Sequence, residues 1–136
     1  MLAKVELPVC PVATTVDLIG NKWKVLIIRE LLKGTYRFNE LHRSIEGISQ
    51  KVLTENLRKL ESDGIIQRTV YAEVPPRVEH SLSQLGDTLR PIIEVMRAWG
   101  NDYLNGNLPG IENTEKIKNF FYWQSLGIRH YLPISK

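Results

Sequence analysis

The chain has 136 residues, of which 43% are hydrophobic and 24% charged, and its net charge is +3 at pH 7. This length corresponds to one globular domain with a terminal extension, and the composition can supply a hydrophobic core. No apolar run is long enough for a membrane span or a secretory signal, so we expect a cytoplasmic protein without a membrane partner. The single cysteine excludes an internal disulfide framework, and we expect neither a metal site nor another cofactor.

The first part of the chain predicts three short helices. Residues 11–19 begin with Pro11, which is typical of a first helical turn. The apolar side chains of residues 22–34 recur at helical spacing and predict a second helix. Residues 35–37 form a short extended link to a third helix, which we expect over residues 38–47.

Residues 47–66, GISQKVLTENLRKLESDGII, predict a short turn followed by a helix with two distinct faces. Three leucines at helical spacing face a core: Leu53, Leu57 and Leu60. The opposite face carries an outward row of side chains, called here the donor stripe: Lys51, Thr54 and Arg58. Ser49 can cap the start of this helix, and Gly64 can adopt the left-handed conformation that often follows a helix end. Two helices joined by such a glycine-containing turn form a helix-turn-helix.

Beyond this helix the sequence alternates between apolar and polar residues. Residues 65–74 and 77–83 are rich in β-branched and aromatic residues and predict two strands that pair as a hairpin. From Ser83 the helical spacing returns, and Pro91 is expected to kink or offset this long helix. The sequence NGNLPG at residues 105–110 ends it.

This order of elements predicts a mainly α-helical protein with a small β-hairpin, the winged helix-turn-helix. In this fold the hairpin does not cover the second helix of the helix-turn-helix, so the donor stripe faces outward. A helix has the right width to enter the major groove of DNA.

Four motifs in this order resemble the HxlR-type winged helix-turn-helix transcription regulators of bacteria: CPVATTVDLIGNKWKVLIIRELLKG, RFNEL, GISQKVLTENLRKLESDGII and PPRVEHSLSQLGDTLRPI. The resemblance implies a homodimer in which the first and last core helices join two winged units. His80 stands where members usually carry Tyr, and Ser83 stands where Thr is common. We therefore expect a DNA-binding domain with dimerisation helices over residues 1–105, and a C-terminal extension of unknown role over residues 106–136.

The predicted DNA contacts on the helix-turn-helix are Ser49, Gln50, Lys51, Thr54 and Arg58. A hydroxyl group and free backbone N–H groups at a helix start suit phosphate, and the longer side chains can reach base edges. The alternative is that Ser49 only caps the helix, while Arg58 only pairs with Glu55 or Glu61. The surrounding helix-turn-helix and hairpin favour the DNA-binding interpretation.

Arg77, which follows the hairpin loop, is a further predicted contact with phosphate or a minor groove. Its alternative is a solvated loop charge. Lys33, Arg37 and Arg43 are weaker candidates for backbone contacts. The three histidines are scattered along the sequence and favour structural or solvated roles.

Cys10 directly precedes Pro11, so its thiol is expected at the cap position of the first helix, where a thiolate is favoured. The resembled family commonly has a cysteine here, and some members use it to sense oxidants or electrophiles. With one cysteine per chain, oxidation would need a Cys10–Cys10 bond between subunits, a mixed disulfide or direct alkylation. The alternative is a partly buried, unreactive cysteine with a capping role.

The function that we expect is a homodimeric, sequence-specific regulator that binds double-stranded DNA at a pseudo-palindromic operator and responds through Cys10. Met96, Trp99 and Tyr103 would suit the dimer seam. A dimer places the two helices that carry the donor stripe about 34 Å apart, which is one turn of DNA. The alternatives are a regulator that answers to an unknown small molecule without thiol chemistry, and a winged-helix protein-interaction module. We expect no enzyme, since a thiol enzyme would need a histidine beside Cys10.

Overall fold

The computed structural model describes residues 10–111 of the chain. The chain divides into a first compact unit that ends at Ile93 and a second that begins at Glu94. Within residues 10–111, no helix combines the length and the apolar character that crossing a membrane requires. The elements in chain order are α1 (Pro11–Ile19), α2 (Lys22–Leu31), β1 (Tyr36–Arg37), α3 (Phe38–Ser44), α4 (Gln50–Ser62), β2 (Ile66–Tyr71), β3 (Arg77–Leu82), α5 (Gln84–Asp87) and α6 (Arg90–Leu104).

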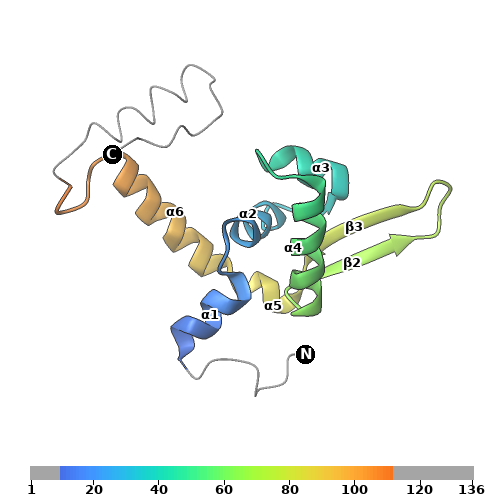
Figure 1. Cartoon of the computed structure of the whole chain (residues 1–136), viewed down its shortest axis with the longest axis horizontal. Helices are drawn as coiled ribbons and strands as arrows, with labels where there is room; N and C mark the ends of the chain where they lie inside the picture. Colours follow the sequence, from blue (N-terminus) through green and yellow to red (C-terminus); the bar gives the residue numbers. More distant parts are fainter. Residues whose placement is uncertain (1–9, 112–136) are drawn as a thin grey trace. The chain divides into compact units, whose positions relative to one another are not determined.

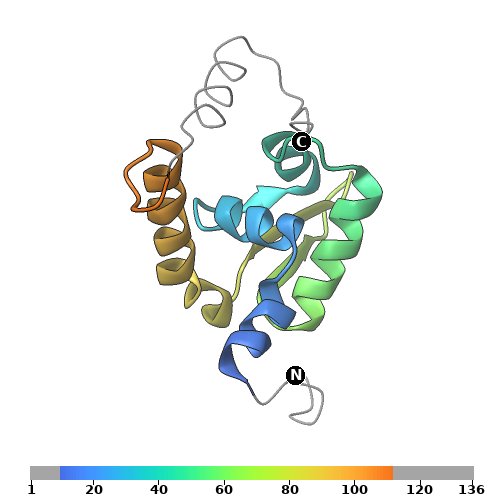
Figure 2. The same ribbon diagram turned by 60° about the vertical axis from the view of Figure 1, so that its left-hand side comes forward.

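The hydrophobic core of the first unit is built mainly from isoleucine and leucine side chains of α2, α3 and α4. Those with almost no exposed surface are Ile27, Ile28, Leu41, Ile45, Leu53 and Leu60. Helix α4 contacts α2 and β2, and α2 also contacts β3. Figure 2 shows α2 in the middle of this unit, with α1, α3 and α4 around it. The inward leucines that the sequence predicts on α4 are therefore confirmed as core residues.

The sheet has three antiparallel strands in the order β1-β3-β2, whereas the sequence predicts only a two-stranded hairpin. Residues 35–37, expected as a link, contain strand β1, where Tyr36 lies opposite His80 and Arg37 opposite Glu79. Two residues are too short to show an alternating pattern, so only the pairing with β3 identifies this strand. The β2–β3 hairpin extends away from the helices of its unit as a wing (Figure 1).

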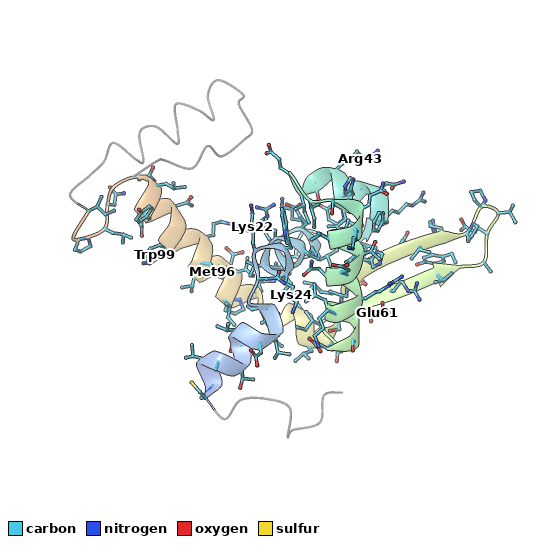
Figure 3. All side chains as sticks on the ribbon, in the orientation of Figure 1. Lys22, Lys24, Arg43, Glu61, Met96 and Trp99 are labelled. Carbon is cyan, nitrogen blue, oxygen red and sulfur yellow. The ribbon has the colours of Figure 1, made fainter. Side chains whose placement is uncertain are left out.

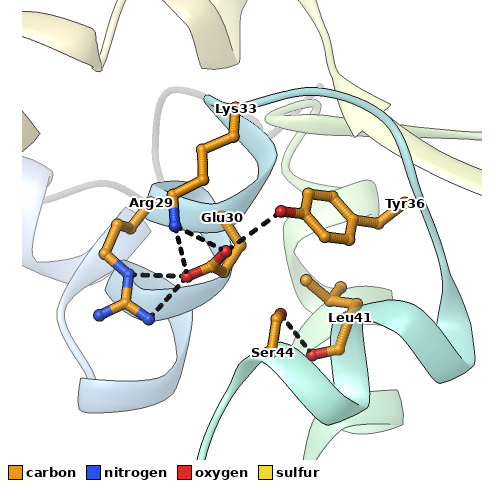
Figure 4. Close-up of polar contacts among 6 residues, drawn as sticks. All are labelled: Arg29, Glu30, Lys33, Tyr36, Leu41 and Ser44. Carbon is orange, nitrogen blue, oxygen red and sulfur yellow. Dashed lines mark hydrogen bonds and ion pairs between the residues drawn. The ribbon is translucent and has the colours of Figure 1, made fainter.

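A buried carboxylate connects α2 to β1. The Glu30 side chain is 5% exposed and forms ion pairs with Arg29 at 2.8 Å and Lys33 at 3.1 Å. The Tyr36 hydroxyl donates a hydrogen bond to Oε2 of Glu30 at 3.2 Å (Figure 4). Burial acts to raise the pKa of Glu30, but hydrogen bonds and charges from Lys33 and Arg29 outweigh it and hold the pKa below its usual value.

The long helix expected from Ser83 is divided into α5 and α6. Proline at position 91 cannot donate the backbone hydrogen bond that a continuous helix would require, so it lies in the first turn of α6 instead. The Ser83 hydroxyl caps α5 by accepting from the Gly86 N–H at 3.0 Å, and it donates to the carbonyl of Ile65 at 2.9 Å. A Cβ at Gly86 would lie 2.1 Å from that Ile65 carbonyl oxygen, so this close approach requires glycine.

Helix α6 carries an apolar face that is exposed in the single chain. The residues on this face are Ile92, Met96, Trp99 and Tyr103, with exposures between 37% and 59%. The rings of Trp99 and Tyr103 stack with their centroids 5.6 Å apart. The predicted break at residues 105–110 is present as turns, and the predicted extension lies outside the described residues from position 112 onward.

Candidate nucleic-acid interface

The start of α4 is fixed by a side-chain cap. The Ser49 Oγ accepts a hydrogen bond from the Val52 N–H at 3.1 Å, as the sequence predicts. In the preceding turn, Nε2 of His42 lies 2.9 Å from the Ile48 carbonyl oxygen, which only accepts, so this nitrogen is the donor. Gly64 follows the helix end with φ of +76°, the left-handed conformation expected there. Local contacts thus determine both ends of α4.

The donor stripe is not uniform in its contacts. Lys51 is exposed and lies 3.9 Å from a Glu55 carboxylate oxygen, which is a long and solvated ion pair. The Thr54 hydroxyl donates to the Gln50 carbonyl at 2.8 Å within the helix. The hydroxyl hydrogen is therefore used internally, which leaves the methyl group and an oxygen lone pair of Thr54 for contacts outside α4.

Arg58 makes no hydrogen bond or ion pair with any residue in the described range 10–111. The two acidic residues that were its alternative partners are engaged elsewhere, Glu55 with Lys51 at 3.9 Å and Glu61 with Arg68 at 3.7 Å. Arg58 is exposed on α4. Its guanidinium therefore offers an uncompensated charge and several donors to an external partner.

Arg77 has a different environment from Arg58. Its guanidinium lies 3.4 Å from Glu73 and 3.5 Å from Glu79, and it is positioned over the Tyr71 ring at 4.0 Å from the centroid. The Arg77 side chain is 30% exposed. Two carboxylates and an aromatic ring thus hold this arginine in the wing, so an external anion would compete with Glu73 and Glu79 for it.

The other basic residues near the helix-turn-helix also differ in whether their charge is already paired. Lys33 is bound to Glu30 in the network that joins α2 to β1. Arg37 and Arg43 are exposed, and their side chains form no ion pair within residues 10–111; Figure 3 labels Arg43 on α3. Arg37 and Arg43 are therefore better placed than Lys33 for contacts with an external phosphate.

Cys10 is the N-terminal cap residue of α1, but its thiol forms no capping hydrogen bond, which corrects the expected capping role of the side chain. Only its backbone carbonyl takes part, accepting from the Thr14 N–H at 2.9 Å and the Thr14 hydroxyl at 3.0 Å. Cys10 is exposed. The thiol is therefore open to small oxidants in the single chain.

Two buried polar residues were not identified as important from the sequence. His80 lies in the central strand with 6% exposure, and its buried Nδ1 has no hydrogen-bond partner among residues 10–111. Asn56 is a buried amide on the inward face of α4. A polar residue at an inward position of an amphipathic helix is the signal that could have drawn attention to Asn56.

Comparisons with known proteins identify the class of this fold and site. The family described as HxlR-like helix-turn-helix matches residues 18–107. The chain belongs to this family and is a helix-turn-helix transcriptional regulator. Within residues 10–111, no group of three or more histidine, cysteine, aspartate or glutamate residues is arranged to hold a metal ion.

The individual relatives carry the same description. HTH-type transcriptional regulator YdeP of Bacillus subtilis (strain 168) is 50% identical over 94 residues, which cover 69% of this chain and 73% of that protein. HTH-type regulator YtfH of Escherichia coli (strain K12) is 37% identical over 102 residues, 75% of this chain and 78% of that protein. Both names describe regulators of transcription and not enzymes.

Solved structures of similar chains confirm the winged helix-turn-helix. The redox regulator HypR in its oxidized form matches with a TM-score of 0.66 and 48% identity, covering 68% of this chain and 96% of that one. The reduced form of the transcriptional regulator YodB from B. subtilis matches with a TM-score of 0.62 and 36% identity, covering 71% and 95% of the two chains.

Proposed function

We propose that the chain is a cytoplasmic, homodimeric regulator that binds double-stranded DNA in a sequence-specific manner at a pseudo-palindromic operator. The observation that carries this proposal is the outward face of α4, where the exposed Arg58 has no partner within the described residues. An exposed arginine without an acidic neighbour is suited to a guanine edge or a phosphate. Family membership supports the same proposal.

Each residue of α4 has a distinct role in the proposed complex. Gln50 and Lys51 would reach base edges near the helix start, and Arg58 would bind a guanine or a phosphate further along. The Thr54 hydroxyl is bonded within the helix, so its methyl group would contact a thymine methyl. Ser49 and the first free N–H groups of α4 would contact phosphate.

Arg77 is proposed as a weaker DNA contact in the wing. A phosphate would have to replace Glu73 or Glu79, which lie 3.4 Å and 3.5 Å from the guanidinium. Part of the electrostatic gain from DNA would therefore offset the loss of an existing ion pair. We expect a smaller loss of affinity on removal of Arg77 than on removal of Arg58.

The proposed dimer would use α6 together with α1. Trp99 on α6 is 59% exposed and Met96 is 47% exposed, and both side chains project from this helix (Figure 3). Val12 and Val16 of α1 are also exposed, at 72% and 54%. Large apolar side chains gathered on one helix face are typical of an interaction surface. A dimer would present two copies of α4 to successive half-sites, about 34 Å apart.

We further propose that oxidants or electrophiles control this regulator through Cys10. The thiol is exposed, and one similar solved structure is named as a redox regulator in its oxidized form while another is of diamide-treated YodB. A bond between two Cys10 residues would release two protons and pass two electrons to the oxidant. A small-molecule effector without thiol chemistry is the alternative mode of control.

The proposal is tested by fluorescence anisotropy with DNA from upstream of the protein's own coding region and with a scrambled duplex. We expect the upstream DNA to bind more tightly, with an affinity that falls steeply as salt rises. Diamide should release the DNA and a reductant should restore binding, while Cys10→Ser should be unaffected by diamide. Equal, salt-insensitive binding to both duplexes would reject sequence-specific DNA binding and favour a protein-interaction module.

Arg58→Ala and Arg97→Ala form a matched pair for the same assay. Arg97 is an exposed arginine on α6 paired with Glu94 at 3.1 Å, so its removal changes the net charge equally but away from α4. We expect Arg58→Ala to weaken binding by about tenfold or more, equivalent to 1–3 kcal/mol for a base contact. Equal effects of the two substitutions would indicate that only the net charge matters.

A further inference from the structure

A chain of hydrogen bonds joins the start of α2 to the middle of α4. Oδ1 of Asn21, the cap residue of α2, accepts from the Lys24 N–H at 2.7 Å. Nδ2 of Asn21 donates to Oδ1 of Asn56 at 3.0 Å. Nδ2 of Asn56 then donates to the Val52 carbonyl at 2.8 Å. Each amide thus both donates and accepts, and the two helices are connected side chain to side chain.

Asn56 lies on the side of α4 opposite the donor stripe. At about 100° of rotation per residue, the three stripe residues are each roughly 140–160° away from Asn56 around the helix axis. The inward leucines lie on the same side as Asn56, and Leu53, Leu57 and Leu60 are all at most 4% exposed. The Asn21–Asn56 bond therefore holds α4 from behind the surface that would meet DNA.

The leucines and the asparagine constrain α4 in different ways. Apolar burial is non-directional, so the leucines hold α4 against the core more strictly than they fix its rotation about its own axis. A hydrogen bond depends on both distance and angle, so it constrains that rotation. A polar residue among apolar neighbours is known to select one register of packed helices, as a single asparagine does in coiled coils.

We propose that the Asn21–Asn56 bond sets the rotation of α4 and thereby determines the DNA sequence specificity of the protein. This inference rests on the proposed DNA binding and concerns positioning residues that act through the donor stripe. A rotation of about 20° would move side-chain atoms roughly 5–6 Å from the axis by about 2 Å. Base-edge hydrogen bonds do not survive such a displacement, whereas the attraction to phosphates changes little.

Two substitutions remove the bond while keeping the local structure. Asn21→Ser retains a good helix cap for α2 but is too short to reach Asn56. Asn56→Leu replaces the amide with an apolar side chain of similar size in the core. Leu57→Val is the matched control, because it weakens packing on the same side of α4 and leaves the Asn21–Asn56 bond intact.

The full-length variants are compared first without DNA. Residual dipolar couplings of backbone amides, measured by NMR, report the orientation of α4 relative to α2. We expect a changed orientation in Asn21→Ser and Asn56→Leu and an unchanged one in Leu57→Val. Unchanged couplings in both asparagine variants would overturn the proposal without reference to DNA.

The same variants are then tested with the tightest duplex that the wild type selects from a random pool, and with a scrambled duplex. We expect the ratio of the two Kd values to fall at least tenfold in both asparagine variants. Binding to the scrambled duplex should stay within about twofold, and Leu57→Val should keep the wild-type ratio.

The two measurements separate the possible failures. A ratio retained in both asparagine variants would overturn the role in specificity, even if α4 had rotated or the melting temperature had fallen. If the wild type selected no sequence at all, the proposed function itself would fail, and no bond within the chain could determine a specificity that does not exist. The dipolar couplings would then still show whether the bond fixes α4.

Discussion

Glu30 shows how much of this structure depends on single buried polar groups. The Glu30 side chain is only 5% exposed, and its carboxylate binds Arg29, Lys33 and Tyr36. A buried carboxylate costs free energy unless it is paired and hydrogen-bonded, and here it is both. The same group holds β1 against α2 and so supports the edge of the wing.

Glu30→Gln is expected to lower the free energy of unfolding by about 1–3 kcal/mol, because it weakens several charge-assisted hydrogen bonds at once. Urea denaturation at pH 7 measures this loss. Glu94→Gln is the control, since the exposed Glu94–Arg97 pair should contribute at most about 1 kcal/mol. Since the pKa of Glu30 is lowered in the folded state, its contribution should disappear as the pH falls below about 4.5.

His80 predicts a second dependence on pH, with the loss of stability beginning nearer neutrality. Burial lowers the pKa of His80 below its usual value of 6.5, with the charge of Arg68 acting in the same direction and Glu61 opposing both. The folded state therefore binds fewer protons than the unfolded state, so stability is lost as the pH falls through 6.5. Melting temperatures at pH 7.5 and 5.5 should differ more in the wild type than in His80→Phe. An equal difference in both proteins would contradict this role.

At the level of whole elements, α4 was the most predictable part of the chain. Its cap at Ser49, its inward leucines and its glycine end are all local signals, because they depend on residues a few positions apart. Strand β1 was not predicted, because it is defined only by its pairing with β3. At Pro91 the sequence predicted a kink or an offset, and the chain instead forms two separate helices, α5 and α6. The close approach of Gly86 to the distant carbonyl of Ile65 could not be predicted from a local pattern.

The same contrast between local signals and long-range contacts applies to the candidate site. The positions of the donor stripe on α4 could be read from helical spacing alone. That Arg58 is uncompensated could not be read in this way, because the pairing of Glu61 with Arg68 depends on where β2 packs beside α4. The Asn21–Asn56 bond joins residues far apart in the sequence, so no local pattern could reveal it.

Gly86→Ala and Gly100→Ala test the packing of these elements. A Cβ at position 86 would lie 2.1 Å from a backbone oxygen, so the junction of α5 and β2 must shift, at a cost of about 1–3 kcal/mol. At Gly100 within α6 the added methyl meets nothing within 4 Å, and alanine should stabilise the helix by about 0.5–1 kcal/mol. Thermal unfolding should therefore give a lower melting temperature for Gly86→Ala and a higher one for Gly100→Ala than for the wild type.

At the scale of the whole molecule, the proposed dimer depends on the apolar face of α6. Trp99→Asp places a charge in the middle of this face, next to the stacked Tyr103. We expect the variant to sediment as a monomer in analytical ultracentrifugation while keeping its helical circular dichroism. Its affinity for a two-half-site duplex should fall by at least tenfold, because each half-site would then bind independently. An unchanged dimer would exclude this face as the seam.

Cys10 and Asn21 lie at the two ends of α1. Cys10 is the N-terminal cap residue of α1, and Asn21, the cap residue of α2, follows the end of α1 after one glycine. In the proposed function, oxidation of Cys10 and DNA binding by α4 are coupled, so thermodynamic reciprocity would apply to the two events. If oxidation of Cys10 weakens operator binding by a given factor, the bound operator must disfavour the oxidised form at equilibrium by the same factor. Oxidation of Cys10 would therefore require a more oxidising environment when the regulator is bound to its operator than when it is free in solution. Redox titration with and without operator DNA would measure that difference directly.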